Sequence, residues 1–163
     1  MGTLEQTIAN AAAKSGSPGA SPRDEETKLL ELGLLDENPF QPRVSIDPDE
    51  LNELAASIAS KGQLQAIVVR PTASGRYTIV AGHCRVAAFR KLQESDAQKY
   101  GRIRATLRLA LTDADLASMA YAENVTRSGL TAVEEGRALE RMVDAKLAET
   151  NEDLARLTQQ PLQ

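Results

Sequence analysis

Hydrophobic and polar residues alternate along this chain with two periods, one typical of helices and one typical of strands. Over residues 46–62, leucine, isoleucine and alanine recur at intervals of three and four, which predicts a helix with one apolar face. Those positions are Leu51, Leu54, Ala55 and Ile58. Asp47 as the N-cap, Pro48 in the first turn and Gly62 after the last turn favour the same bounds.

The strand period is clearest in the middle of the chain. Two short runs rich in β-branched residues, 66–70 and 76–81, are separated by Pro-Thr-Ala-Ser-Gly, a pattern that predicts a β-hairpin. Residues 102–110 alternate between apolar and polar side chains, which predicts a half-buried strand. Its expected inner face consists of Ile103, Ala105, Leu107 and Leu109. Its expected outer face is basic and consists of Arg102, Arg104, Thr106 and Arg108.

Helical signals account for most of the remaining chain. We expect helices over 24–35, 83–98, 112–123 and 131–148, and a further helix that begins at residue 151. Thr112 with Asp115, and Thr131 with Glu134, have the spacing of capping boxes, which supports the two helix starts nearest to them. The strands and helices together predict an α+β fold.

Composition divides the chain into three parts. Residues 1–23 are small, polar and punctuated by glycine, serine and proline, which predicts a flexible tail. We expect an α+β core over 24–111 and a helical C-terminal part over 112–163. The 163 residues contain no tryptophan and only 3% aromatic residues, so the core must be aliphatic.

The cysteine count and the hydropathy indicate the cellular location of the protein. A single cysteine excludes an internal disulfide, which suits a reducing cytoplasm. No apolar run approaches the roughly 18 residues of a membrane span, and no signal peptide is visible. We therefore expect a cytoplasmic protein with no membrane span.

Charge is unevenly distributed along the chain. The net charge is -4, yet residues 61–108 contain ten lysine or arginine residues and only two acids, Glu94 and Asp96. This segment has a net charge of +8, so the rest of the chain carries -12. Such a distribution favours a local anion-binding site over a general nucleic-acid coat, although a solvated surface with chance clustering gives the same pattern.

The junction between the strand at 76–81 and the next helix concentrates unusual chemistry. Gly82, His83, Cys84 and Arg85 follow one another there, and they include the only histidine and the only cysteine. A helix that begins directly after a strand presents free N–H groups that attract anions. Glycine would let a ligand approach closely, arginine can bind phosphate with two bonds, and histidine can bind phosphate or metal or act as a base. The alternative is an ordinary turn with a surface histidine and a half-buried cysteine.

A second candidate cluster lies later in the chain. Glu123 and Asn124 are adjacent oxygen ligands of the kind that Mg²⁺ accepts beside nucleotide phosphates. Arg127, three residues on, can contact a further phosphate. The alternative is a polar surface at the end of a helix. The pair becomes significant if the fold brings it to the junction at residues 82–85.

Four motifs, in this order, resemble the amino-terminal domain of ParB-type partition proteins. They are NPFQPR, LAASIASKGQLQAIVVRP, GRYTIVAGHCRVAAFRKL and YAENVTRSGLTAVEEGRAL, and the resemblance covers about residues 36–148. It implies the ParB/sulfiredoxin fold, a small mixed sheet with packed helices and a helical C-terminal part. It also implies a domain that binds CTP with Mg²⁺ and hydrolyses it.

The match to the family's motifs is incomplete at the junction. The central family motif is Gly-Glu-Arg-Arg, of which Gly82 and Arg85 match the two ends. His83 stands where the glutamate is expected, and Cys84 stands where the first arginine is expected. The other motifs match at Gln41, Pro42, Arg43, Glu123, Asn124 and Arg127. The resemblance thus predicts a triphosphate cradle and leaves CTP-driven clamp behaviour open.

Candidate roles follow from the resemblance and the local chemistry. The expected phosphate or nucleotide contacts are Gln41, Arg43, Gly82, His83, Arg85, Asn124 and Arg127. The expected Mg²⁺ ligands are Glu123 and Asn124, and the expected catalytic residues are Glu123 and His83. The expected contacts to a DNA backbone are Arg102, Arg104 and Arg108.

The last residues of the sequence indicate which members of the superfamily the chain resembles. NEDLARLTQQPLQ resembles the first helix of a helix-turn-helix unit, and we expect a protein without the recognition helix that would follow. This organisation resembles stand-alone plasmid fertility-inhibition proteins of the oncogenic-suppression (Osa) type. The resemblance implies an ATP- or CTP-hydrolysing enzyme that also cleaves DNA without sequence preference and inhibits conjugative or T-DNA transfer.

Two alternatives stay open. The first is a truncated partition-type module that binds CTP and clamps DNA during plasmid or chromosome segregation. The second is a sulfiredoxin-like redox enzyme that uses Cys84. The expected partners are DNA, a nucleoside triphosphate, a protein of the conjugation or partition machinery, and a second copy of the chain in a nucleotide-dependent dimer.

Overall fold

The protein is described by a computed structural model that covers residues 25–41, 46–128 and 131–159. The expected flexible tail at 1–23 lies outside these residues. The elements in chain order are β1 (Glu25–Glu31), a 3-10 turn η2 (Leu32–Leu34), β2 (Leu35–Asp36), α2 (Pro48–Lys61), β3 (Ile67–Pro71), β4 (Tyr77–Ala81), α3 (His83–Ser95), α4 (Ala97–Tyr100), β5 (Arg102–Arg108), α5 (Asp113–Ser128), α6 (Ala132–Asp144) and α7 (Asn151–Thr158).

The strands form one mixed sheet in the order β1-β5-β3-β4-β2. β1 pairs antiparallel with β5, and β3 pairs antiparallel with β4, which confirms the predicted hairpin. β3 pairs parallel with β5, and β2 pairs parallel with β4. A mixed sheet with packed helices confirms the predicted α+β class.

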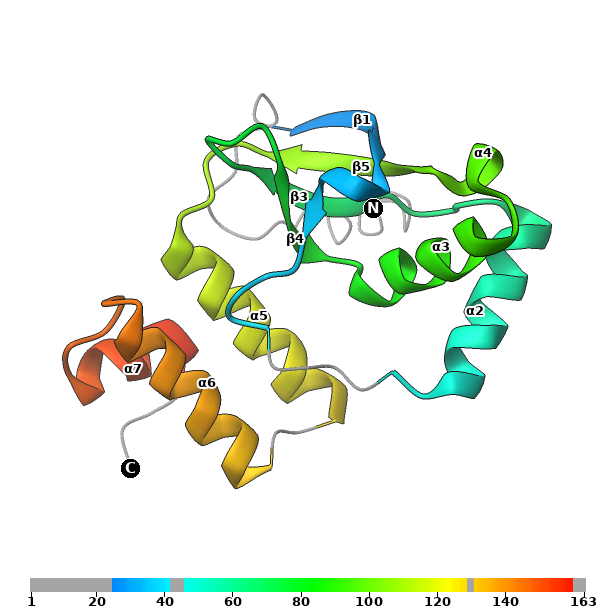
Figure 1. Cartoon of the computed structure of the whole chain (residues 1–163). Coiled ribbons are helices and arrows are strands. Elements are labelled where there is room, and N and C mark those ends of the chain that lie inside the picture. The colour runs from blue at the N-terminus through cyan, green and yellow to red at the C-terminus, as the bar shows by residue number, and fades with distance from the viewer. Residues whose placement is uncertain (1–24, 42–45, 129–130, 160–163) are drawn as a thin grey trace, which may run out of the picture.

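Helices cover both faces of this sheet (Figure 1). Ile79 and Val80 are neighbours on β4 and point to opposite faces, because side chains alternate along a strand. Ile79 joins the core under α2 and α3, whereas Val80 joins a second core with residues of α5 and α6. Both cores are mostly aliphatic, and the aromatic residues buried in them are Phe89 and Tyr100 in the first and Phe40 and Tyr121 in the second.

The predicted helix over 24–35 is wrong. Residues 25–35 of that range lie in β1, the 3-10 turn and β2. β1 pairs with β5 along its whole length, from Glu25 opposite Arg108 to Glu31 opposite Arg102. The segment is rich in leucine and glutamate, which favour helices, but the gain from pairing with β5 overrides that weak preference.

Other boundaries also differ from the sequence prediction. α3 ends at Ser95, three residues before the expected end. α5 continues to Ser128, so the Glu123–Asn124 pair lies inside a helix and does not end it. β5 ends at Arg108, and Leu109, expected on the inner face, is 54% exposed beyond the strand. α6 ends at Asp144, four residues before the expected end.

The helix starts agree well with the predicted caps. Asp47 accepts a hydrogen bond from the backbone N–H of Asp49 (2.8 Å) at the start of α2. Thr131 and Glu134 form the expected capping box at α6. Among the described residues, none of the helices has the length and apolar character that crossing a membrane requires.

Candidate functional site

The start of α3 carries no side-chain cap. Gly82 is the N-cap residue, with φ 99° and ψ 24°, and no side chain accepts a hydrogen bond from the first turn there. A Cβ atom at Gly82 would lie 2.7 Å from Cγ2 of Ile67. Glycine is therefore needed for the left-handed backbone and for packing against β3. Close approach of a ligand, the reason expected from the sequence, stays a prediction.

His83 is the first residue of α3 and is only 9% exposed. Neither ring nitrogen has a hydrogen-bond partner among the described residues. Burial lowers the pKa of His83, while Glu123 and Glu37 oppose the shift and Arg90 adds to it. The surface histidine of the alternative reading is therefore wrong. A buried imidazole with two unused polar atoms is costly unless a ligand, water or another residue meets them.

The turn at residues 38–41 lies between α3 and α5. Asn38, which is 3% exposed, donates to the backbone carbonyl of Leu116 in α5 (3.4 Å) and accepts from the N–H of Phe40 (3.0 Å). The N–H of Gln41 donates to the carbonyl of Asn38 (3.0 Å). The side-chain Oε1 of Gln41 is buried without a partner among the described residues.

An ion pair places this turn along the His83 face of α3. Nη1 of Arg90 lies 2.7 Å from Oε1 of Glu37, the residue just before the turn. Arg90 follows His83 by seven residues, or about two helical turns, so both side chains lie on the same face of α3. Glu37 and Asn38 were missed in the sequence analysis, although the Asn-Pro pair at 38–39 is a known turn signal.

Glu123 and Asn124 approach this region from α5. Both are half-buried, and Glu123 is close enough to His83 to affect its pKa. Nδ2 of Asn124 donates to the carbonyl of Ala120 (2.6 Å), so Oδ1 is the atom that can face a ligand. A carboxylate and an amide oxygen suit Mg²⁺. The described residues contain no group of three or more histidine, cysteine, aspartate or glutamate residues able to hold a metal.

Arg85 lies beside the junction but is already engaged. Its Nη1 donates to the carbonyls of Ala66 (3.0 Å) and Gln65 (3.4 Å), and its Nη2 donates to Oε1 of Gln65 (3.1 Å). The same Nη1 is 3.4 Å from the position of a Cβ on Gly82. Arg85 thus connects the loop before β3, residues 62–66, to the start of α3.

Two further candidates, Arg43 and Arg127, have side chains that the structure does not describe. Arg43 lies outside the described residues. Arg127 belongs to α5, but its side chain is outside the described part of the chain. Cys84 follows His83 and is half-buried.

The three arginines expected to contact DNA lie on β5, beside β1. Arg104 donates through Nη2 to the carbonyls of Gln63 and Leu64, each at 2.8 Å. Arg102 lies 3.8 Å from Glu31, and Arg108 pairs in register with Glu25.

Acids from outside the basic segment at 61–108 pair with four of its ten basic residues. Four of its arginines form ion pairs with acids from outside it: Arg70 with Asp113, Arg76 with Asp36, Arg90 with Glu37, and Arg102 with Glu31.

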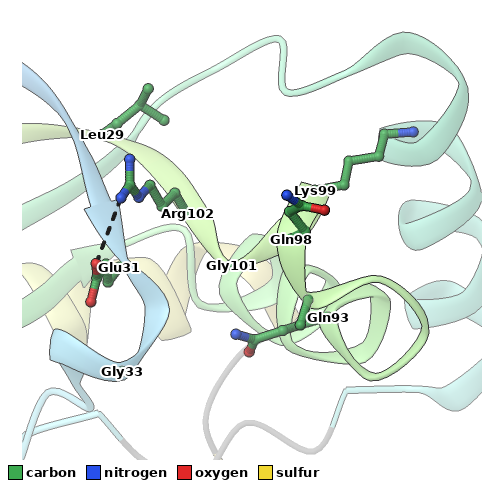
Figure 2. Close-up of a pocket in the computed structure, with 9 residues that line it drawn as sticks. Leu29, Glu31, Gly33, Gln93, Gln98, Lys99, Gly101 and Arg102 are labelled. Atoms are coloured by element: carbon green, nitrogen blue, oxygen red, sulfur yellow. Dashed lines mark ion pairs between the residues drawn. The ribbon is translucent and has the colours of Figure 1, made fainter.

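An open groove lies at the other end of α3 (Figure 2). It is lined by Leu29, Glu31, Gly33, Gln93, Ala97, Gln98, Lys99, Gly101 and Arg102. Gln93 is ten residues from His83, or about 15 Å along the helix. The groove is therefore separate from the polar atoms at residues 41 and 83.

Comparison with curated proteins reveals relatives in two groups. The chain is 37% identical over 120 residues to a nucleoid occlusion protein from Lysinibacillus sphaericus, across 74% of this chain and 38% of that protein. It is 36% identical over 130 residues to a probable chromosome-partitioning protein ParB from Coxiella burnetii, across 80% of this chain and 42% of that protein. The chain thus spans about two fifths of the length of these relatives.

The solved structures that are similar to this chain include chromosome-partitioning proteins as well. The C-terminally truncated chromosome-partitioning protein ParB from Caulobacter crescentus, complexed with CTP-gamma-S, is similar with a TM-score of 0.50 and 29% identity, over 83% of this chain and 72% of that one. The same protein complexed to the centromeric parS site is similar with a TM-score of 0.51 and 27% identity, over 82% of this chain and 65% of that one. The family model described as the ParB N-terminal domain matches residues 17–125, more than half of the chain, and the chain therefore belongs to the ParB N-terminal domain family.

Proposed function

We propose that this domain binds CTP with Mg²⁺ at the start of α3. The observation that carries the proposal is the buried His83, whose two ring nitrogens have no partner among the described residues, at a helix start without a side-chain cap. The first-turn N–H groups and the helix dipole favour an anion there. The likeness to a ParB complexed with CTP-gamma-S supports a nucleoside triphosphate as that anion.

Each candidate residue has a role in this proposal. The neutral His83 donates one ring N–H to a phosphate oxygen, and Arg85, Arg43 and Arg127 are candidate cationic contacts. Glu123 and Asn124 would hold Mg²⁺, which neutralises phosphate charge when it is bound. Gln41 offers a buried acceptor, Oε1, which suits an N–H or O–H group of the nucleoside.

Hydrolysis is the second step of the proposal. Burial lowers the pKa of His83, so the imidazole is neutral at pH 7 and can accept a proton from water. Glu123 lies near it and would orient that water or the metal. These two residues remain our candidates for catalysis.

Direct titration tests the proposal. Calorimetric titrations with CTP, ATP, GTP and UTP, each with Mg²⁺, should give measurable binding for CTP and weaker binding for the other three. Tripolyphosphate with Mg²⁺ serves as the control for phosphate contacts alone. A chain that binds none of the four nucleotides would refute the proposal, and tighter binding of ATP would change the nucleotide to ATP.

The biological setting we propose is a partition or nucleoid occlusion system. The relatives named above are chromosome-partitioning and nucleoid occlusion proteins, and the solved relative was complexed to the parS site. Because this chain spans about two fifths of those relatives, DNA loading, a partner protein and a nucleotide-dependent dimer belong to the proposal.

A second candidate is metal-dependent DNA cleavage that limits conjugative transfer. A neutral histidine beside a carboxylate is favourable chemistry for activating water against a phosphodiester. The 9% exposure of His83 argues against it, because a DNA strand is bulkier than a triphosphate chain. Incubation with supercoiled plasmid and Mg²⁺ decides the matter, since nicking that His83→Ala abolishes would establish a nuclease.

A further inference from the structure

Arg141 of α6 contacts the turn at residues 38–41 from the helical C-terminal part. Its Nη1 donates to the backbone carbonyl of Gln41 at 3.0 Å, across 100 positions of sequence. Arg141 is half-buried, and a hydrogen bond from a charged donor is stronger than a neutral one. The bond therefore fixes the peptide plane that carries Gln41.

The turn is held from a second side by α5. Asn38 donates a hydrogen bond to the carbonyl of Leu116, and its side-chain oxygen accepts one from the N–H of Phe40. The N–H of Gln41 donates to the backbone carbonyl of Asn38 within the turn. The backbone of Gln41 is thus bonded through both its N–H and its carbonyl. Its side-chain Oε1 remains buried without a partner among the described residues. The backbone bonds orient an acceptor that the described residues do not use.

α6 has another, separate tie to the core. The hydroxyl of Tyr121 in α5 donates to Oε1 of Glu135 in α6 at 2.6 Å. Ala138 and Met142 of α6 are buried in the same core as Phe40. This tie docks α6 on α5 without touching Gln41. It provides a matched control for any effect that follows merely from loosening α6.

We propose that Arg141 is a positioning residue for the nucleotide site, and that it acts by holding Gln41 in place. The inference rests on the proposed function of the same site. Linkage makes the effect reciprocal, so a nucleotide that engages Gln41 stabilises the contact of α6 with the turn. The helical C-terminal part then responds to nucleotide through one identified bond.

The test compares Arg141→Met with Tyr121→Phe. Methionine keeps the apolar stem of arginine and removes its donors, while phenylalanine keeps the ring and removes the hydroxyl. Calorimetric titration with CTP and Mg²⁺ should show about tenfold weaker binding for Arg141→Met, as expected for a lost charge-assisted bond. Tyr121→Phe should bind as the parent does, and Arg141→Lys should recover part of the affinity.

A nucleotide-free measurement separates positioning from stability. By NMR, the Gln41 amide of Arg141→Met should exchange its hydrogen faster than in the parent, and Tyr121→Phe should leave that rate unchanged at a similar melting temperature. Should Arg141→Met unfold, Arg141→Gln replaces it, with the same expected results.

The outcomes are distinct for the two claims. A parent that binds CTP while Arg141→Met binds it equally well would overturn this inference alone. Equal losses of affinity in Arg141→Met and Tyr121→Phe would also overturn it, because general docking of α6 would then explain both. A parent that binds no nucleotide would overturn the proposed function and this inference with it.

Discussion

Two polar regions flank the loop before β3, and they differ in how completely their groups are paired. On the β5 side, Arg104 donates to the carbonyls of Gln63 and Leu64, and Arg102 lies near Glu31. At the start of α3, both nitrogens of His83 are buried without partners among the described residues, and the same holds for Oε1 of Gln41 in the turn at residues 38–41. Arginines in a sequence suggest an anion-binding site, but arginines that are paired within the fold contribute to its structure. Unpaired buried atoms are the better mark of a binding site.

The largest effect expected from this contrast concerns Glu123. If the site holds Mg²⁺, Glu123→Gln should reduce CTP turnover about a hundredfold, because a carboxylate that places the metal or water acts mainly on the reaction. Binding of CTP should be largely kept. A phosphate-release assay with the parent and Glu123→Gln measures the rate, and the exposed Glu140→Gln is the control. Equal turnover in both variants would remove Glu123 from the site.

A pair of arginine variants sharpens the comparison. Arg85 and Arg104 both donate to carbonyls of the loop before β3, so Arg85→Met and Arg104→Met should each lower the free energy of unfolding by about 1–2 kcal/mol. Only Arg85 lies beside Gly82, so only Arg85→Met should also weaken CTP binding, by about tenfold. Denaturant melts and calorimetric titration measure the two effects. Equal affinity in both variants would make Arg85 purely structural.

This domain alone should bind DNA weakly, and its affinity should fall only slowly as the salt concentration rises. Contacts to DNA phosphates release counterions, so three available arginines would give a logarithmic slope of at most about 3. Arg102 and Arg104 are already engaged, which reduces that number. A fluorescence-anisotropy series on unrelated duplexes measures the slope. A steeper slope would mean that basic residues other than these three also contact DNA.

The smallest effect is on stability against pH. Burial lowers the pKa of His83 in the folded state from its ordinary value of 6.5, so below pH 6.5 the unfolded chain binds more protons. The stability from neutral His83 is complete above that pH and is lost as the pH falls toward the lower folded pKa. Melts of the parent and of His83→Gln between pH 7.5 and 5.5 compare the two slopes. The parent should lose more stability than the variant, and parallel slopes would contradict a buried neutral imidazole.

The parts of the fold that were predictable are those with a local cause. The caps at Asp47 and Thr131 and the hairpin of β3 and β4 depend on neighbouring residues, and they were predicted. The strand β1 was not, because its partner β5 lies about 77 residues later and its own composition favours a helix.

The site shows the same division. Gly82 and His83 were predictable as a strand-to-helix junction, and the motif match indicated Gln41 and Glu123. The burial of His83 could not be read from the sequence, since it requires the turn at 38–41 and α5 to meet α3. The pairing of Arg104 with the carbonyls at 63 and 64 was equally hidden, which is why the β5 arginines looked available.

The central claim is that the unpaired His83 marks the nucleotide site, and one pair of variants tests it most directly. His83→Ala and Cys84→Ser change neighbouring residues in the same first turn of α3. Titration of the parent and both variants with CTP and Mg²⁺ should show at least about tenfold weaker binding for His83→Ala, because the site loses a buried hydrogen-bonding group. Cys84→Ser should bind as the parent does. Parent-like affinity in His83→Ala, or a loss confined to Cys84→Ser, would contradict the account.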